Sequence, residues 1–179
     1  MADLRVRSVL VTGANRGIGL GFVRQFLQMP KPPERVFAAC RDPKGQRAQA
    51  FLPLLKKAAQ GSPGSVLSCS KAAIVNISSA AGSITSPFGW DKLQVVSYRC
   101  SKAALNMLTK CQSLGYREHG ILCIALHPGW VQTEMGSSSG DTPPVTVDAS
   151  VQGMLKVLSS LSKKDSSTFL NWKGNVVPW

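Results

Sequence analysis

At 179 residues, with 44% hydrophobic and 17% charged side chains, the chain is long enough to form one domain with a buried core over residues 1–179. Its five cysteines form no Cys-x-x-Cys pair and no set with paired histidines, which disfavours both a disulfide framework and a metal site. The net charge of +12 comes from scattered lysines and arginines without a nucleic-acid-binding motif, so we expect no nucleic-acid partner. A basic nucleic-acid binder is the alternative that steep salt dependence would reveal.

Membrane association is not expected from the sequence. No window approaches the ~18 consecutive apolar residues of a membrane span, and no small-residue cleavage site follows the apolar run near the N-terminus. Reduced thiols are the simplest interpretation of the odd number of cysteines. Together these features predict a cytoplasmic protein.

A strand, a glycine turn and a helix are predicted at the start of the chain. The β-branched run 6–12 has strand length and leads into Thr-Gly-Ala-Asn-Arg-Gly-Ile-Gly at 12–19. Apolar residues at helical spacing then predict a helix that ends before Pro30; they are Ile18, Phe22, Val23, Phe26 and Leu27. Glycines at such a junction let the backbone approach a phosphate at the helix N-terminus. The alternative is a tight turn with nothing bound.

The second predicted strand, 35–40, ends at Arg41, where dinucleotide-binding folds meet the adenosine ribose. A basic residue there suits a 2′-phosphate, whereas an acidic residue suits a free 2′-hydroxyl. Arg41 and Arg16 together favour NADP(H), and Asp42 is the feature that favours NAD(H). Two solvated arginines are the alternative interpretation.

Alternating helices and strands are predicted for the rest of the chain. We expect a helix over 46–60 with Phe51, Leu54, Leu55 and Ala58 on its apolar face, strands at 72–77, 120–126 and 168–170, and a helix over 147–161. The serine- and glycine-rich piece 136–144 has the composition of a mobile lid. Ser79 follows the third strand, at the sheet edge where open α/β folds place ligands.

The helix that begins near Val96 carries Tyr98 and Lys102, which lie one turn apart on the same helix face. A tyrosine hydroxyl titrates near ~10 in water, and a neighbouring ammonium favours its phenolate. The spacing alone is a weak signal, because a solvated helix pair shows it by chance. The core stripe of this helix is predicted to be Ala104, Leu105, Leu108 and Cys111.

Four motifs occur in order: the turn 12–19, Asn-Ile-Ser-Ser at 76–79, Tyr98 with Lys102, and Pro-Gly-x-x-x-Thr at 128–133. Together they resemble the motifs of the short-chain dehydrogenase/reductase family. Within it the chain looks most like the carbonyl reductases related to sniffer and to bacterial C-factor, judging by Arg-Asp-Pro at 41–43, the long loop before Tyr98 and the ending 172–179. The resemblance implies an NADP(H)-dependent oxidoreductase that reduces a carbonyl to an alcohol. The family often forms homodimers through helices beside the active site, but one of those helices is shortened in this chain, so the resemblance allows a homodimer without requiring one.

The resemblance also implies roles for individual residues. Tyr98 would donate the proton, Ser79 would orient the substrate oxygen, and Lys102 would lower the tyrosine pKa and hold the nicotinamide ribose. The cofactor-binding residues implied are Gly13, Asn15, Arg16, Gly17, Ile18, Gly19, Arg41, Tyr98, Lys102, Pro128, Gly129, Val131 and Thr133. Large apolar residues near the site predict a small apolar carbonyl substrate; they are Phe88, Trp90, Trp130 and Met135.

The chain departs from the family in its middle. The resemblance implies an α/β fold of three layers, a Rossmann-like doubly wound parallel sheet, from which two strands and their helices are missing. About two βα units of ~30 residues each are absent. Our hypothesis is an internally deleted form, such as a splice variant. The alternative function is then a non-catalytic remnant that acts through a full-length partner.

The missing strands leave two arrangements for the centre of the sheet. Either the first strand pairs directly with the Ser79 strand, which moves Ser79 and Tyr98 by one strand spacing of ~4.8 Å, or the two edges stay unpaired. Each unpaired buried amide costs ~1 to 3 kcal/mol.

Overall fold

Strands and helices alternate along the chain in a computed structural model that describes residues 4–39, 47–60, 69, 71–87, 89–91, 94–138 and 140–179. The regular elements are β1 (Ser8–Thr12), α1 (Gly17–Leu27), β2 (Arg35–Ala39), α2 (Arg47–Gln60), β3 (Ala73–Ile77), α3 (Val96–Gly115), β4 (Leu122–His127), α4 (Val147–Ser160) and β5 (Phe169–Asn171). Short 3-10 turns are η1 (Ala80–Gly82), η2 (Arg117–His119) and η3 (Lys163–Asp165). The predicted order of strands and helices is confirmed.

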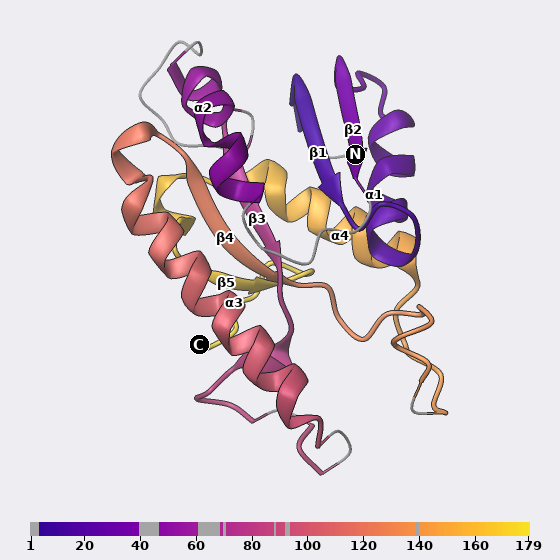
Figure 1. The fold of residues 1–179 in the computed structure, drawn as a ribbon. Helices are drawn as coiled ribbons and strands as arrows, with labels where there is room; N and C mark the ends of the chain where they lie inside the picture. Colours follow the sequence, from indigo (N-terminus) through magenta and orange to yellow (C-terminus); the bar gives the residue numbers. More distant parts are fainter. Residues whose placement is uncertain are drawn as a thin grey trace.

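The strands are all parallel, but they form two sheets (Figure 1). β1 pairs with β2, and β4 lies between β3 and β5. Within the described ranges no ladder joins β1 to β3, so the second of the two expected arrangements is the one observed. The shift of Ser79 by one strand spacing, which direct pairing would require, therefore does not arise.

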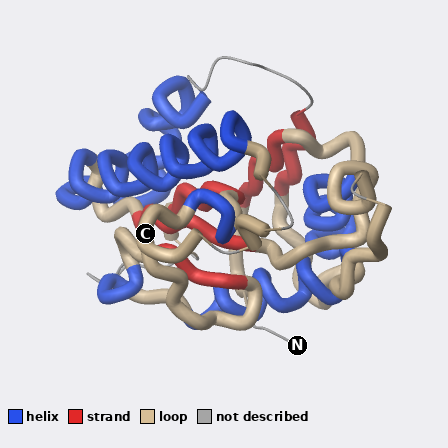
Figure 2. Tube along the Cα trace, turned by 90° about the horizontal axis from the view of Figure 1, so that it is seen from below, coloured by secondary structure: helices blue, strands red, loops and turns tan. Residues whose placement is uncertain are grey.

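The strands lie between helices on two sides, as a doubly wound α/β fold requires (Figure 2). One core joins α1, β4 and α4, with Phe22, Phe26, Ile124 and Met154 among its buried members. A smaller core on the other side packs α2 against β3 and β4. β4 is the central strand, since Leu122 to Leu126 are fully buried. A strand that is buried on both faces needs apolar residues at consecutive positions, and this explains the continuous apolar run in the sequence of β4.

The predicted core stripe of α3 is wrong. Ala104, Leu108 and Cys111 are exposed and Leu105 is only half-buried, whereas the buried residues of the helix are Asn106, Thr109, Gln112 and Ser113. Each of these polar side chains has a hydrogen-bond partner: Thr109 and Gln112 on β3, Asn106 in the segment after β3, and Ser113 within α3 itself. The Nδ2 of Asn76 on β3 donates to Thr109 Oγ1 and to Gln112 Oε1, each at 2.8 Å. Because buried polar groups with partners cost little, the polar face can point inward.

The predicted apolar face of α2 is also partly wrong. Leu54 is 62% exposed, while Leu52, Leu55 and Ala59 pack against the smaller core. The side chain of Phe51 lies outside the described residues. Across the described part of the chain, none of the helices has the length and apolar character of a membrane span.

Candidate active site

The glycine turn has the expected shape at the N-terminus of α1. Gly13 and Gly17 adopt φ of +67° and +53°, a left-handed conformation that glycine accepts without strain. A Cβ added to Gly19 would lie 2.2 Å from the Gly13 carbonyl oxygen, so the turn can close only with glycine there. The side chain of the N-cap residue, Arg16, makes no capping hydrogen bond to the first turn of α1. Its backbone N–H groups are therefore available to an anion, and the residues fit a dinucleotide phosphate.

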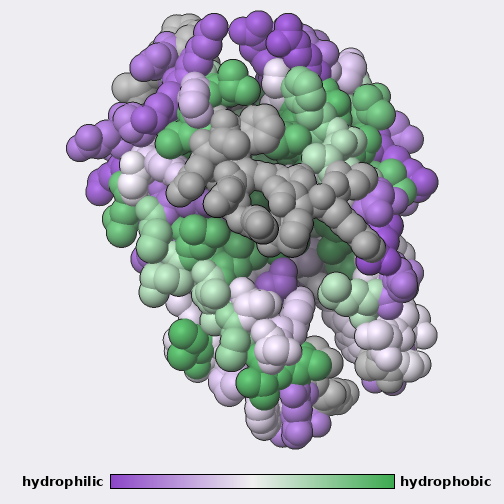
Figure 3. Space-filling view, in the orientation of Figure 1, coloured by the Kyte–Doolittle hydropathy of each residue, from purple (hydrophilic) through white to green (hydrophobic). Residues whose placement is uncertain are grey.

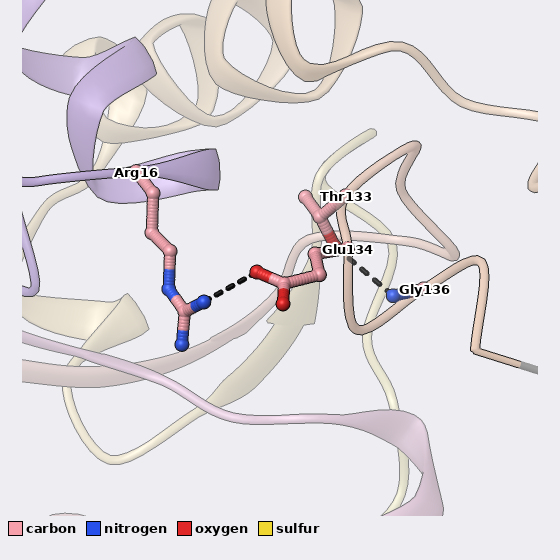
Figure 4. A network of polar contacts seen from close by, with 4 residues as sticks. All are labelled: Arg16, Thr133, Glu134 and Gly136. Atoms are coloured by element: carbon pink, nitrogen blue, oxygen red, sulfur yellow. Dashed lines mark hydrogen bonds and ion pairs between the residues drawn. The ribbon is translucent and has the colours of Figure 1, made fainter.

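The turn contacts the loop that follows β4 (Figure 4). The guanidinium of Arg16 forms an ion pair with the carboxylate of Glu134, and both side chains are largely exposed. A Cβ on Gly17 would lie 3.4 Å from Thr133 Cγ2. Thr133 Oγ1 in turn accepts a hydrogen bond from Gly136 N at 3.0 Å. The structure thus brings together two predicted cofactor-binding segments that lie more than a hundred residues apart in the sequence. In this structure Arg16, predicted to bind a phosphate, forms its ion pair with the Glu134 carboxylate.

The Pro128 to Thr133 loop contacts α4 and the C-terminal region. The hydroxyl of Ser150 donates to the Pro128 carbonyl at 2.6 Å. Gly129 has φ of +89°, and a Cβ there would lie 2.9 Å from Trp172 Nε1. Val131 is 4% exposed and pairs with Val145. The Pro128 to Thr133 loop is therefore fixed to α4 and to Val145, the residue that follows the predicted lid.

Ser79 lies directly after β3 and begins η1. Its hydroxyl oxygen accepts a hydrogen bond from Ala81 N at 3.2 Å. The preceding Ser78 is buried and donates to Asn106 Oδ1 at 2.6 Å, and Asn106 Nδ2 donates to the Gly82 carbonyl at 3.2 Å. Ser78 is thus a structural anchor, and Ser79 is the serine presented at the carboxyl edge of the sheet.

Tyr98 and Lys102 lie at the start of α3 beside the end of β3. Lys102 Nζ donates to the Ile77 carbonyl at 2.9 Å and lies 5.6 Å from the centroid of the Tyr98 ring. Burial lowers the pKa of Lys102, because it penalises the charged form. A Cβ on Gly82 would lie 2.7 Å from the Lys102 carbonyl carbon, so η1 packs directly on this turn of α3. Ser79, Tyr98 and Lys102 are therefore on two elements in contact.

His127, the last residue of β4, lies in this region and is not among the predicted site residues. Its Nδ1 is buried and has no hydrogen-bond partner in the described structure. Burial, and then the positive charge of Lys102, lower the pKa of His127 to about 4. The signal in the sequence is its place at the end of a strand, immediately before Pro128 and Gly129. A buried ring nitrogen without a partner among the described residues, close enough to feel the Lys102 charge, makes His127 a candidate functional group at the carboxyl end of β4.

The remaining predicted site residues are either outside the described part of the chain or exposed on its surface. Arg41 and Phe88 lie outside the described residues. Trp90, Trp130 and Met135 are described and exposed, and Trp130 Nε1 donates to the Gly136 carbonyl at 2.8 Å. No cluster of potential metal ligands occurs among the residues that are described.

A family model described as short chain dehydrogenase matches residues 46–144, more than half of the chain. The chain belongs to the short-chain dehydrogenase family. Among curated relatives, C-signal of Myxococcus xanthus is 43% identical over 83 residues, covering 46% of this chain and 48% of that protein. Short-chain dehydrogenase srdF of Neurospora crassa is 36% identical over 138 residues, covering 73% and 50%. The chain spans about half the length of these curated relatives.

Solved structures of short-chain dehydrogenases are similar to the whole chain. An NADPH-bound carbonyl reductase from chicken fatty liver is 49% identical with a TM-score of 0.92, covering 100% of this chain and 96% of that chain. Carbonyl reductase Sniffer of D. melanogaster is 28% identical with a TM-score of 0.87, covering 98% and 100%. The resemblance to carbonyl reductases of this family is confirmed.

Proposed function

We propose that this chain is an NADPH-dependent carbonyl reductase that converts a small apolar aldehyde or ketone to an alcohol. The observation that carries the proposal is the position of Lys102, hydrogen-bonded to the end of β3 and facing the Tyr98 ring. This arrangement puts a cation, a phenol and the Ser79 hydroxyl at the carboxyl edge of a parallel sheet, where α/β folds bind ligands. Its support from relatives is the chicken enzyme, a carbonyl reductase with NADPH bound.

In the proposed chemistry, each side chain has one task. The Tyr98 hydroxyl gives its proton to the carbonyl oxygen of the substrate, and the Ser79 hydroxyl donates a hydrogen bond that orients that oxygen. The Lys102 ammonium stabilises negative charge on the phenolate that Tyr98 leaves behind. Proton donation of this kind is worth about 10² to 10⁴ in rate, and positioning supplies much of the rest.

The cofactor site of the proposal is the glycine turn together with the Pro128 to Thr133 loop. NADPH, when bound, supplies the hydride that reduces the carbonyl carbon. The uncapped N-terminus of α1 and the left-handed Gly13 and Gly17 support a diphosphate at this turn. Arg16 is proposed to bind the 2′-phosphate after leaving Glu134, and Arg41 is proposed as the second cation.

The substrate class is argued from exposed apolar side chains on two loops. Trp90 stands before α3, and Trp130 and Met135 follow β4; they are 43%, 41% and 71% exposed. Exposed large apolar residues beside a polar site favour an apolar ligand over a charged one.

Three further features stay predictions from the sequence: a single domain, a cytoplasmic location and a homodimer.

A second candidate function is favoured by the interrupted sheet. The absence of a β1–β3 ladder among the described residues leaves the cofactor turn and the Tyr98 region without a shared strand pair. An error of ~1 Å in positioning costs roughly a hundredfold in rate, so the interruption favours a non-catalytic form that acts through a full-length partner.

Turnover separates the two candidates. NADPH oxidation by the purified chain is measured by absorbance with an apolar aldehyde, and the Tyr98→Phe variant is expected to lose about 10² to 10⁴ in rate. The chain has two tyrosines, so Tyr116→Phe is the matched control and should keep its activity. Absence of turnover in the unmodified chain, or equal turnover in Tyr98→Phe, would refute the catalytic proposal.

A further inference from the structure

The connection from β3 to α3 joins Ser79 of the proposed site to Trp90, one of the apolar side chains proposed to contact the substrate. Its first part packs closely on α3, since a Cβ on Gly82 would lie 2.7 Å from the Lys102 carbonyl carbon. At its other end, the Arg99 guanidinium of α3 lies 5.3 Å from the Trp90 ring centroid. Hydrophobic side chains are visible in this lower part of the molecule (Figure 3). Because both ends contact α3, the course of the residues between them sets how Ser79 and Trp90 stand relative to each other.

The middle of this connection, residues 83–86, is held by Trp179. The backbone N–H of Thr85 donates to the main-chain oxygen of Trp179 at 2.8 Å, and the Ser83 hydroxyl donates to the same oxygen at 3.4 Å. Ser83 is 7% exposed, and its hydroxyl oxygen accepts a hydrogen bond from Ser86 N at 3.0 Å. Ser83 N donates to the Ala80 carbonyl at 3.0 Å, so the segment 83–86 continues directly from η1. One acceptor therefore fixes the residues that follow the active-site serine.

Trp179 is itself fixed by β5 and α3. The chain reverses after β5 at Gly174, which has φ of +89°, and Val177 N then donates to the Phe169 carbonyl at 2.8 Å. The Trp179 ring stacks on that of Phe169, which is 1% exposed, with 5.6 Å between the ring centroids. Lys110 Nζ of α3 lies 5.1 Å from the Trp179 ring centroid, and Figure 1 shows the end of the chain beside this helix. Stacking and a cation over the ring both stabilise one position of Trp179.

We propose that Trp179 is a positioning residue for the carbonyl substrate. By holding the segment 83–86, it sets the position of Ser79 relative to Trp90. The inference rests on the proposed carbonyl reductase function, because it assigns a further residue to that same site. Trp179 contacts β5, α3 and the segment 83–86, whereas the proposed NADPH site consists of the glycine turn and the Pro128 to Thr133 loop. Loss of the Trp179 ring should therefore weaken the use of the carbonyl substrate and leave NADPH binding unchanged.

The kinetic test compares substitutions of Trp179 in the full chain. Trp179→Ala should raise the KM for an apolar aldehyde at least about tenfold, since an error of ~1 Å in positioning can cost a hundredfold. Trp179→Phe keeps a ring to stack on Phe169 and to face Lys110, so it should restore most of this loss. Val176→Ala, in the same returning segment with Val176 72% exposed, is the matched control and should keep the KM of the unmodified chain. A purely structural role would lower the folded fraction and the apparent kcat, but it would not move the KM.

Amide hydrogen exchange gives a second measurement that needs no turnover. In the unmodified chain without ligands, the Thr85 amide is protected by its hydrogen bond to Trp179. Without the ring the main-chain oxygen of residue 179 loses its fixed position, so Trp179→Ala should speed Thr85 exchange at least about tenfold. The amide of Ile124, fully buried in β4, should keep its protection and show that the variant folds.

Each contrary result has a separate meaning. Unchanged Thr85 exchange in Trp179→Ala would overturn the inference, because Trp179 would not hold the segment 83–86. Faster exchange with an unchanged KM would also overturn it, because the held segment would not position the substrate. Absence of turnover in the unmodified chain would instead refute the proposed function and remove the role given to Trp179 in it, while Thr85 exchange would still decide whether Trp179 holds the segment.

Discussion

Acid should destabilise the folded chain through His127. Nδ1 of this residue is buried without a partner among the described residues, and burial together with the Lys102 charge lowers its pKa from 6.5 to about 4. In the unfolded chain the imidazole takes up a proton as the pH falls below about 6.5, whereas in the folded chain it stays neutral until about pH 4. The unfolded state binds more protons throughout this window. Stability is therefore lost as the pH falls from about 6.5 to 4.

The size of the effect follows from those two pKa values. Between pH 7 and pH 5 the difference in proton uptake by His127 amounts to about 2 kcal/mol of unfolding free energy. For a chain of this length, that corresponds to a fall in melting temperature of about 4 to 8 °C from this residue alone. The carboxylates also make the unfolding free energy depend on pH. A variant that lacks only the His127 imidazole keeps this contribution, so comparing it with the unmodified chain isolates the effect of His127.

The assay is thermal or urea unfolding at pH 7 and pH 5 for the unmodified chain and for His127→Gln. The unmodified chain should lose about 2 kcal/mol more than the variant over this interval. The chain has two histidines, and the exposed His119 supplies the control, since His119→Gln should keep the full acid sensitivity. Equal acid sensitivity in the unmodified chain and His127→Gln would refute the reasoning, as would an NMR titration that places the pKa of His127 near 6.5.

Two further predictions concern contacts that hold the site. If Arg16 binds the cofactor as proposed, Glu134→Gln should tighten NADPH binding by up to about fivefold, because the exposed Arg16–Glu134 ion pair is worth at most about 1 kcal/mol and would have to break first. Equal or weaker binding in a titration would contradict this. Gly82→Ala should destabilise the chain by about 1 to 3 kcal/mol in urea unfolding, because its Cβ would lie 2.7 Å from the Lys102 carbonyl carbon. Gly115→Ala, where nothing lies within 4 Å, is the matched control, and equal losses in both would show that η1 does not pack as described.

The regular elements could be predicted because their sequence patterns have local causes. The run from Ile121 to Leu126 is apolar at every position, which is typical of a strand buried on both faces, and β4 is that strand. The turn 12–19 was placed by its glycines, and Gly13 and Gly17 adopt the left-handed conformation that makes glycine necessary.

The orientation of α3 could not be predicted from periodicity. Hydropathy assigns Leu108 and Cys111 to the core, but the hydrogen bonds from Asn76 to Thr109 and Gln112 make the polar face the buried one. Those partners are more than thirty residues apart, and no local pattern connects them. The Arg16 to Glu134 pair is the same kind of case, because only the fold brings the glycine turn to the loop after β4.

The break between β1 and β3 was one of two arrangements that the missing strands allowed. Handedness permitted direct pairing, and the local sequence of the strands favours neither arrangement. β1 is only partly buried, in contrast to β4, so its edge is not a fully desolvated one. The cost of unpaired amides is smaller at such an edge, because water can reach them.

Whether the chain binds NADPH is decided by a thermal melt of the purified chain with and without NADPH, with NADH as the control. A ligand that binds only the folded state at a hundredfold excess over its dissociation constant contributes ~2.7 kcal/mol, or about 5 to 11 °C for a chain of this length. We expect a cooperative melt whose midpoint NADPH raises by this amount and NADH raises less. This result would mean that the glycine turn and the Pro128 to Thr133 loop form a working cofactor site despite the interrupted sheet. A cooperative melt that NADPH leaves unchanged would contradict NADPH binding and favour the non-catalytic form.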